Sequence, residues 1–388
     1  MTTVLLVDHG PFFGGSESFL IDLLSTIDRR AYTPIIVSDT RSPVLDRLRA
    51  SGDPVLTTPF PRINRSPAFA WRLFRSGWQL AQLARRAHAD LMHTFTARTH
   101  LIGAVAARLS GIPLVWRIGD DTLPMWAMTL FGRIPRCSVA VSDWIAAQYP
   151  QLHFDGLVPD GARPPLTISR AEAHTELGLP SDALVVAHVG RLVRWKGQAA
   201  FIHALAQAAL TVPNLRGLIV GTWHAEDDRP GPLGGGESYY RDLRALAVEL
   251  GLNSPNNERL TFSGFVRDPG LAYAAADLFA HTSTLPEPFG RTIIEAMMAG
   301  CPVIAARAGG PAEIIVDGQS GLLTTPGDVP ALAAALIELL TSNERRAQLG
   351  QAARQRAEAE YTLAIMTRRM EETYRLALAS YRNHDHRP

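Results

Sequence analysis

Apolar residues along this chain fall into short continuous runs that alternate with segments of helical periodicity. Residues 4–7 and 184–189 are two such runs, and a loop and an amphipathic segment follow each of them. Continuous apolar runs are typical of strands that are buried on both faces, as in a parallel sheet. The repeated strand–helix alternation in both halves therefore predicts an α/β fold with doubly wound, Rossmann-like sheets.

The same pattern gives the individual elements. A long last helix over 363–382 lies outside both alternations, and the proline- and glycine-rich stretch 224–237 is expected to be a mobile surface insertion. Strands are expected over residues 4–8, 33–38, 90–93, 114–118, 138–141, 184–189, 216–220, 260–262, 277–280, 303–305 and 322–323. Other helices are expected from residue 16 or 17, over 44–50, 68–87 and 99–109, from 143, and over 198–209, 239–250, 271–275, 291–299, 331–340 and 345–358.

The alternation is interrupted once, at residues 157–165, where Pro164 and Pro165 follow a strand-like segment. A chain of 388 residues is longer than one ordinary hydrophobic core supports. We therefore expect a first domain over 1–163, a second over 164–362 and a C-terminal helical segment over 363–388.

Composition narrows the class of protein. Apolar residues make up 46% of the chain and charged residues 19%, which indicates a globular protein. The net charge of +1 argues against a general nucleic-acid binder. The N-terminus has no basic segment, and no apolar run reaches about 18 residues, so neither a signal peptide nor a membrane span is expected. Cys137 and Cys301 are expected to be buried thiols, and the location is expected to be cytoplasmic.

Lysine usage singles out one position. The chain has 38 basic residues, of which Lys196 is the only lysine. It lies in the segment Gly190–Gly197, directly after the apolar run 184–189, together with Arg191. Ligands of open α/β sheets bind beyond the carboxyl ends of the strands, so this segment is a candidate diphosphate clamp that needs a compact ammonium group. The alternative is an ordinary basic turn, which the nearby Arg194 disfavours because it shows that arginine is used freely there.

Two carboxylates define a second candidate segment. Glu287 and Glu295 are separated by seven residues, with the turn Pro288–Gly290 after the first and a helix carrying the second. The free N–H groups of that helix N-terminus attract anions. Acceptors on both sides of such donors suit a ligand with hydroxyls and phosphates, such as a nucleotide sugar. The alternative for Glu295 is an exposed helix position, which its apolar neighbours disfavour.

Together, these segments resemble the retaining nucleotide-sugar glycosyltransferases of group 1, the superfamily that includes glycogen and sucrose synthases. The resemblance is dense in the second half and looser in the first. It implies the GT-B fold, in which two Rossmann-like domains face each other across a cleft and a C-terminal helix crosses back to the first domain. It also implies that the first domain binds the acceptor and the second the nucleotide sugar. Further matching segments are 262–265, 276–278, 308–313, 317–322 and 326–328.

The resemblance also implies roles for individual residues. Arg191 and Lys196 would hold the donor diphosphate, Glu295 would accept hydrogen bonds from the ribose, and Glu287 would contact the transferred sugar. The pair Gly14 and Gly15 resembles the family's N-terminal glycines, which approach the donor phosphate and the acceptor. Other donor-binding positions implied by the resemblance are Gly190, Phe265, Phe289, Gly290, Arg291 and Thr292.

The first half departs from the family pattern at one place. Many relatives have a histidine after the strand that corresponds to residues 114–118, whereas this chain has Arg117 followed by Gly119 and Asp120. Arg117 is a candidate contact to sugar or phosphate, and Asp120 a candidate for orienting the acceptor hydroxyl. His93 is a further candidate on the acceptor side, although a histidine after a strand is commonly structural. The alternative is a shifted or impaired site.

The resulting prediction is a retaining hexosyltransferase that uses a front-face mechanism and needs no cofactor. Its partners would be a nucleoside-diphosphate sugar and a glycan or lipid-linked acceptor. Metal independence is expected because Arg191 and Lys196 supply the positive charge that Mg²⁺ would bring. The alternatives are a sugar-nucleotide epimerase of the same fold and a nucleotide-sugar-binding module without turnover.

Residues 54–89 have an unusual charge pattern, with six arginines and no acidic residue. Trp71, Phe74 and Trp78 fall at helical spacing within this stretch. One interpretation is peripheral contact of residues 62–86 with the inner face of a membrane or with a lipid-linked acceptor. We favour the other interpretation, an amphipathic helix whose aromatic side lies in the core.

Overall fold

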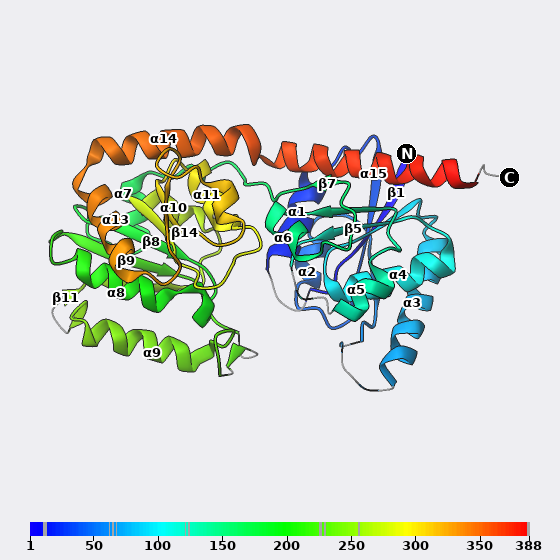
Figure 1. Ribbon diagram of the computed structural model, residues 1–388, viewed down its shortest axis with the longest axis horizontal. Coiled ribbons are helices and arrows are strands. Elements are labelled where there is room, and N and C mark those ends of the chain that lie inside the picture. Colours follow the sequence, from blue (N-terminus) through cyan, green and yellow to red (C-terminus); the bar gives the residue numbers. More distant parts are fainter. Residues whose placement is uncertain are drawn as a thin grey trace. The chain divides into compact units, whose positions relative to one another are not determined.

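The computed structural model describes residues 1–10, 14–61, 63, 66, 68–120, 122, 125–224, 227–228, 230–254 and 257–385. The chain forms two compact units. The first consists of Met1–Gly161 together with Leu363–Pro388, and the second of Ala162–Thr362. Figure 1 shows that each unit contains its own sheet with helices on both faces, as a doubly wound fold requires.

The first unit is built on a seven-stranded, all-parallel sheet with the strand order β3-β2-β1-β4-β5-β6-β7. Its strands are β1 Thr2–Val7, β2 Tyr32–Asp39, β3 Val55–Thr58, β4 Leu91–Thr94, β5 Leu114–Ile118, β6 Cys137–Ala140 and β7 Gly156–Leu157. Its helices are α1 Gly15–Thr26, α2 Leu45–Arg49, α3 Ala68–Arg86, α4 Ala97–Ser110, α5 Met125–Phe131, α6 Asp143–Gln148 and α15 Leu363–Asp385.

The second unit has a six-stranded parallel sheet with the order β12-β9-β8-β13-β14-β15 and a separate antiparallel pair, β10-β11. Its strands are β8 Leu184–Val189, β9 Leu215–Val220, β10 Asn253–Ser254, β11 Asn257–Glu258, β12 Leu260–Gly264, β13 Leu278–His281, β14 Val303–Ala306 and β15 Leu322–Thr324. Its helices are α7 Arg170–Glu176, the 3-10 turn η1 Arg194–Lys196, α8 Gln198–Ala208, α9 Gly236–Glu249, α10 Gly270–Ala275, α11 Arg291–Met298, α12 Pro311–Ile314, α13 Val329–Thr341 and α14 Asn343–Glu360.

Helix α15 belongs to the first unit, although the whole second unit separates it from β7 in the sequence. Met366, Met370 and Tyr374 recur every four residues along it, and all three are buried in the core of the first unit. An apolar stripe with this spacing covers one side of a helix, which then has to pack against another apolar surface. The predicted return of the last helix to the first domain is therefore confirmed.

The predicted strands and helices are present, with ends that differ by at most a few residues. The elements that the apolar pattern did not predict are short, such as β3, β7 and α12. The expected surface insertion at 224–237 also needs a correction, because Gly236 and Glu237 begin α9. Glycine is a poor helix former, which explains why the pattern placed the start of this helix too late.

The orientation of α3 contradicts the interpretation that we favoured from the sequence. Trp71, Phe74 and Trp78 do not lie in the core, because they are 65%, 46% and 50% exposed. Helix α3 instead packs on α4 through a face that contains Gly77, where a Cβ atom would lie 2.4 Å from Cγ1 of Val105. This close approach of the helices leaves no room for a side chain at Gly77, and Trp71, Phe74 and Trp78 are turned outward.

Candidate functional site

The strand order of the second unit has its switch point between β8 and β13. These strands are neighbours, but β8 is followed by β9 on one side and β13 by β14 on the other. Ligands of doubly wound sheets bind at such a point, beyond the carboxyl ends of the strands. The two candidate segments of the sequence, residues 190–197 and 282–290, are the loops that begin there.

Backbone contacts fix these two loops to each other. The amide of Thr284 donates to the carbonyl of Trp195 at 2.7 Å, and the hydroxyl of Thr282 donates to the carbonyl of Gly197 at 3.0 Å. Gly197 has a φ of +74°, and a Cβ atom there would lie 1.9 Å from the carbonyl oxygen of Thr282. Only glycine fits this position without a backbone shift, so the loop geometry depends on it.

The predicted phosphate and sugar residues meet in this loop pair. Nζ of Lys196 lies 2.5 Å from Oε2 of Glu287, and their side chains are 17% and 13% exposed. The same oxygen accepts a hydrogen bond from the Ser283 hydroxyl at 3.2 Å and lies 3.3 Å from Nε2 of His281. Sequence reasoning missed Ser283 and His281, although both lie directly at the end of β13 and could have been found from that position.

The electrostatics of this group keep Glu287 ionised. Burial by itself would raise the pKa of the Glu287 carboxyl. The adjacent Lys196 ammonium and the hydrogen bond from His281 outweigh burial and hold this pKa well below its ordinary value. The site thus contains a shielded carboxylate and ammonium in contact, which can separate to bind a ligand that has both hydroxyl and anionic groups.

The second predicted carboxylate, Glu295, is also not an exposed helix residue. Its side chain is 18% exposed, and it accepts hydrogen bonds from the Tyr273 hydroxyl at 3.1 Å and from Nε of Arg291 at 2.9 Å. Burial and the neighbouring carboxylate raise the pKa of Tyr273, so this tyrosine remains a hydrogen-bond donor. Glu295 is therefore oriented before any ligand arrives.

Arg191 lies at the start of the first loop, where Nη1 is 3.4 Å from Oδ1 of Asp227. Its backbone carbonyl accepts a hydrogen bond from Nε2 of Gln198 at 2.9 Å. The Arg191 side chain is 31% exposed and so can reach a ligand. Asp227 was not predicted because it lies in the stretch that was interpreted as a surface insertion.

The loop after β14 packs against the Glu287 segment and holds it in place. The amide of Gly310 donates to the carbonyl of Glu287 at 2.9 Å, and a Cβ atom on Gly310 would lie 2.2 Å from the carbonyl oxygen of Phe289. The Phe289 side chain is buried and contacts the ring of Tyr361 edge to face, with the ring centroids 5.9 Å apart. Helix α11 starts next to it, so Gly290, Arg291 and Thr292 form the helix N-terminus that the sequence predicted.

Two further predicted residues lie at the carboxyl edge of the same sheet. Gly190 follows β8, and its amide donates to the carbonyl of Val220 at 2.9 Å. Phe265 follows β12 and is 62% exposed, so a ligand could stack on its ring. The structure therefore brings the loop residues predicted in the second half to one edge of one sheet.

The first unit has its own switch point, between β1 and β4. Gly14 and Gly15 lie at the start of α1, where the Gly14 amide donates to Oε2 of Glu17 at 2.9 Å. Asp8, at the end of β1, is fully buried, and burial and the charge of Glu17 raise its pKa well above the ordinary value. Sequence reasoning missed this acidic pair, for which the only signal was an aspartate that ends an apolar run.

Arg117 and His93 make contacts inside the first unit. Nη2 of Arg117 lies 2.7 Å from Oδ1 of Asp160, and its Nε donates to the carbonyl of Val158 at 3.0 Å. His93 is fully buried, and its Nδ1 lies 2.7 Å from the hydroxyl of Tyr374 on α15. These contacts favour structural roles for both residues.

Asp120 lies at the carboxyl edge of the first sheet, beyond β5. Its carboxylate accepts hydrogen bonds from the hydroxyl of Thr122 at 2.8 Å and from the amide of the same residue at 3.2 Å. Its side chain is partly exposed. Of the three candidates in the first half, Asp120 is thus the one that the structure leaves nearest to solvent.

No group of three or more His, Cys, Asp or Glu side chains among the described residues is placed to hold a metal ion. No helix in the described part of the chain has the length and apolar character needed to cross a membrane.

Comparison with known proteins places these features in a family. Residues 169–356 match the model of the glycosyl transferases group 1, and residues 13–158 match that of Glycosyltransferase Family 4. D-inositol 3-phosphate glycosyltransferase of Saccharomonospora viridis is 35% identical over 214 residues, which cover 55% of this chain and 48% of that protein. A GDP-mannose-dependent monoacylated alpha-(1-6)-phosphatidylinositol monomannoside mannosyltransferase of Corynebacterium glutamicum is 32% identical over 207 residues, or 52% of this chain and 49% of that protein.

The chain thus matches about half the length of these curated relatives. A solved structure gives a longer match. The crystal structure of Anabaena HepE in complex with UDP and glucose has a TM-score of 0.81 and 27% identity, and it covers 96% of this chain and 99% of that one. Since family models match both halves and the two Rossmann-like sheets follow the GT-B fold, the chain belongs to the glycosyl transferases group 1.

Proposed function

We propose that this protein transfers a hexose from a nucleoside-diphosphate sugar to an acceptor hydroxyl, with retention of the anomeric configuration. The observation that carries this proposal is the contact between Lys196 and Glu287 at the switch point of the second sheet. The pair combines a cation for phosphate with an anion for sugar hydroxyls. Arg191 lies in the same loop as Lys196, and Glu295 lies in helix α11, which begins directly after the Glu287 loop. The similarity to HepE, whose structure holds UDP and glucose, supports a UDP-linked hexose as the donor.

The ion pair suggests how donor binding proceeds. A donor diphosphate attracts the Lys196 ammonium away from Glu287, and Glu287 then accepts hydrogen bonds from the hydroxyls of the sugar. Removing one partner of a buried pair without replacing it costs about 3–5 kcal/mol. A ligand that supplies a new partner to each side chain avoids this cost, so the pair discriminates against ligands that carry only a phosphate or only a sugar.

Transfer follows a front-face route. The acceptor oxygen forms a bond to the anomeric carbon on the same side from which the phosphate oxygen departs. The proton of the acceptor hydroxyl moves to an oxygen of the departing diphosphate, which leaves as the nucleoside diphosphate. Arg191 and Lys196 stabilise the negative charge that develops on this leaving group, which is the largest catalytic effect we expect. Because these two cations do the work that Mg²⁺ does elsewhere, we propose that transfer is metal-independent.

The first unit is the proposed acceptor-binding part. Gly14, Gly15 and Asp120 lie at the carboxyl edge of its sheet, where open α/β sheets bind ligands. The relatives named above act on inositol 3-phosphate and on a phosphatidylinositol mannoside, which supports a phosphorylated or lipid-linked acceptor. Arg117 and His93 would act there indirectly, by fixing the strands that carry these loops.

A direct assay separates the proposal from its alternatives. The protein is incubated with UDP-, GDP- and ADP-hexoses and a panel of glycan and lipid-linked acceptors, with and without EDTA. We expect nucleotide release together with a glycosylated acceptor, at equal rates in EDTA. A changed sugar on an intact nucleotide would identify an epimerase, and binding without conversion would identify a binding module. Loss of activity in EDTA with rescue by Mg²⁺ would contradict metal independence alone.

The lysine provides a sharper test. We expect Lys196→Arg to lower kcat/KM by about a hundredfold, because a guanidinium cannot take the place of the compact ammonium between Trp195 and Glu287. The control is Arg194→Lys, the reverse exchange in the same loop, at an exposed side chain that pairs with Asp242. Near-normal activity of Lys196→Arg, or an equal loss in Arg194→Lys, would contradict the role given to this lysine.

A further inference from the structure

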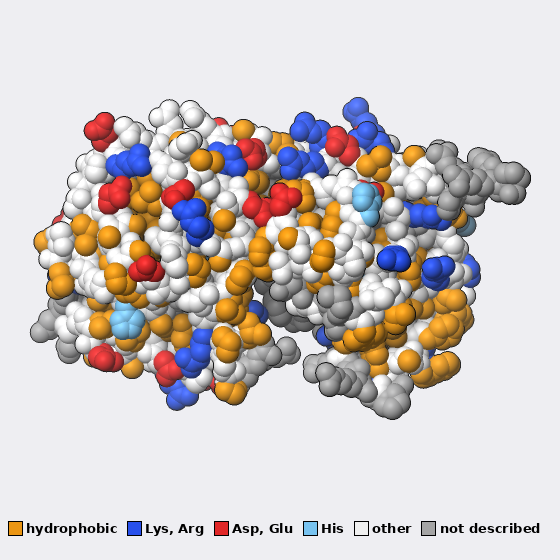
Figure 2. Space-filling model, viewed as in Figure 1, with side chains coloured by type: hydrophobic (Ala, Val, Ile, Leu, Met, Phe, Trp, Pro, Cys, Tyr) orange, Lys and Arg blue, Asp and Glu red, His pale blue; other side chains and the backbone are white. Residues whose placement is uncertain are grey.

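The exposed side of α3 is an apolar surface that the proposed transfer reaction does not use. It is formed by Trp71, Phe74 and Trp78, which we call the α3 aromatic face. The rings of Trp71 and Phe74 are stacked, with their centroids 6.1 Å apart. Figure 2 shows hydrophobic side chains gathered over the part of the first unit in which α3 lies. A contiguous exposed group of large aromatic side chains indicates an interaction surface.

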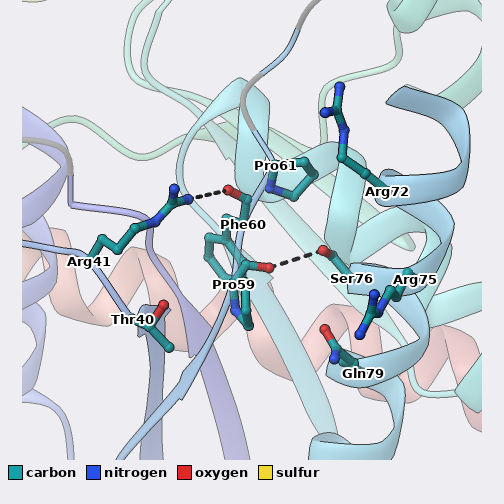
Figure 3. A pocket seen from close by; sticks show the side chains of 9 residues that line it. All are labelled: Thr40, Arg41, Pro59, Phe60, Pro61, Arg72, Arg75, Ser76 and Gln79. Atoms are coloured by element: carbon teal, nitrogen blue, oxygen red, sulfur yellow. Dashed lines mark hydrogen bonds between the residues drawn. The ribbon is translucent and has the colours of Figure 1, made fainter. Parts of the chain in front are cut away.

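A basic pocket of about 670 Å³ borders the same helix. Two of its arginines come from α3, and the third comes from the loop after β2, on the opposite wall (Figure 3). We call it the arginine pocket, and its lining residues are Thr40, Arg41, Pro59, Phe60, Pro61, Arg72, Arg75, Ser76 and Gln79.

Hydrogen bonds hold the walls of the arginine pocket in place. Nη2 of Arg41 donates to the carbonyl of Phe60 at 3.1 Å and lies 3.3 Å from the Asp39 carboxylate. The hydroxyl of Ser76 donates to the carbonyl of Pro59 at 3.0 Å, which attaches α3 to the loop after β3 (Figure 3). The pocket is therefore a formed feature of the unit and not a gap between mobile segments.

The charge of the arginine pocket is positive. Asp39 offsets Arg41, but the described residues that line the pocket include no acidic one, and none occurs anywhere in residues 54–89. Arg72 and Arg75 therefore add positive charge to a stretch of sequence that carries no negative charge. Guanidinium groups bind phosphate oxygens with two hydrogen bonds at once, so an oxyanion, and above all a phosphate, is the ligand that suits this pocket.

The arginine pocket and the α3 aromatic face share one helix, and this indicates where the phosphate comes from. Arg72 and Arg75 alternate in sequence with the residues of the α3 aromatic face. A free phosphate would use only the arginine pocket, whereas a phospholipid bilayer offers phosphate groups next to an apolar layer. Tryptophan side chains favour that boundary, and basic amphipathic helices bind to it. We propose that α3 docks this protein on an anionic phospholipid bilayer, with a lipid phosphate in the arginine pocket and the α3 aromatic face among the outer acyl chains.

Docking at this place has a consequence for the acceptor. The arginine pocket lies beyond the carboxyl ends of β2 and β3, at the same edge of the sheet as Gly14 and Gly15 beyond β1. With about 4.8 Å between neighbouring strands, β3 is roughly 10 Å from β1. A lipid-linked acceptor would thus reach these loops from the bilayer. This consequence rests on the proposed transferase function, whereas the docking itself does not.

Sedimentation with vesicles tests the docking without any assay of transfer. The full chain is mixed with vesicles of phosphatidylcholine alone or of equal parts phosphatidylcholine and phosphatidylglycerol. We expect binding to the anionic vesicles only, and a loss of at least about tenfold in affinity for Arg72→Glu/Arg75→Glu, because each change replaces attraction to the anionic surface by repulsion. Trp71→Ser/Phe74→Ser/Trp78→Ser should also lose binding. The control is Arg368→Glu/Arg369→Glu, which makes the same charge change on α15 of the same unit, away from α3 and the arginine pocket.

Bilayer docking predicts a loss of binding that is confined to the pocket and aromatic variants. Equal losses in both charge-reversal variants would mean unspecific attraction and would overturn the role of the pocket. Thermal stabilisation by glycerol 3-phosphate without any vesicle binding would mean a free phosphate ligand and would overturn bilayer docking. Circular dichroism and thermal melting of each variant show whether it is folded. A wild-type protein that binds vesicles but has no transferase activity would support docking and contradict the transferase proposal.

Discussion

At the scale of single residues, some buried ionisable side chains of this protein stay charged and others stay neutral. Glu287 stays charged because Lys196 is in contact with it, as its lowered pKa reflects. His100 and His188 stay neutral, because burial lowers the pKa of each to about 3. The His100 ring stacks on Trp116 with the centroids 3.6 Å apart, so it has no room for a hydrating water on that face. The buried histidines, and not Glu287, should therefore make stability sensitive to mild acid.

We expect the contribution of His100 and His188 to the free energy of unfolding to fall as the pH decreases from about 6.5 toward about 3. A histidine in the unfolded chain has a pKa of about 6.5 and binds a proton in this range, whereas folded His100 does not until about pH 3. The unfolded state then binds more protons, so acidification favours unfolding, by up to about 1.4 kcal/mol per pH unit for each such histidine. Above pH 7 this contribution is fully present. Urea unfolding at pH 7.5, 6.5 and 5.5 measures the slope.

The variant His100→Gln tests the assignment of this slope. Its absolute stability at pH 7.5 will be lower, because the stacking on Trp116 is lost, but its pH slope should also be smaller. The control for the exchange itself is His153→Gln, at a position whose side chain is 88% exposed. An unchanged slope in His100→Gln would show that other groups cause the acid sensitivity.

At the scale of elements, the junction between β8 and α8 is the most constrained feature of the candidate site. Gly197 caps η1 and starts α8, and its amide donates to the carbonyl of Arg194 at 3.0 Å. The chain passes from η1 into α8 here, directly against the carbonyl of Thr282, which leaves no space for a side chain. The position of Lys196, one residue earlier, is therefore set by a contact between two loops rather than by its own side chain.

We expect Gly197→Ala to destabilise the second unit and to abolish nucleotide binding. The new Cβ would lie 1.9 Å from the Thr282 carbonyl oxygen, so the two loops have to separate. A matched control is Gly178→Ala, at a residue with a φ of +66° and no atom within 4 Å of its Cβ. Both changes carry the cost of a left-handed backbone, about 1–2 kcal/mol, and only Gly197→Ala adds the clash. Thermal melting with and without UDP distinguishes them, and equal shifts in both variants would contradict the argument.

The elements also show what the sequence can and cannot predict. Long apolar runs such as 184–189 and the loops after them were predicted because burial on both faces leaves a clear pattern. Contacts made in three dimensions left no such pattern. Arg117 pairs with Asp160, 43 residues away, and nothing near either residue indicates this. The α3 aromatic face was assigned to the core because helical spacing identifies a face but does not say whether it is buried. Gly77, whose close approach to α4 decides the question, has no side chain to contribute to the pattern.

At the scale of the whole molecule, each unit has its own closed hydrophobic core. Among the described residues, the buried core cluster of the second unit runs from Val186 to Leu349, and that of the first includes Met366, Met370 and Tyr374 from α15. The chain passes from one unit to the other at two places that lie side by side. The Ala162 amide donates to the carbonyl of Tyr361 at 2.7 Å. The adjacent Gly161 lies so close to Leu363 that a Cβ atom would be 2.8 Å from the Leu363 Cα.

We expect residues 162–362 to fold alone and to bind the donor nucleotide, because their core and the loops of the candidate site are complete within that segment. Residues 1–161 alone should not fold. They lack three large buried side chains of α15, and losing such residues costs about 2–5 kcal/mol each, against a total stability of about 5–15 kcal/mol for a domain. Joining Gly161 to Leu363 through a few glycine and serine residues should restore folding, because these two residues are in contact. Circular dichroism, thermal melting and UDP titration of the three fragments check this expectation. A folded 1–161 fragment would show that the first unit does not need α15 to fold. A 162–362 fragment that folds but binds no nucleotide would show that part of the donor site belongs to the first unit.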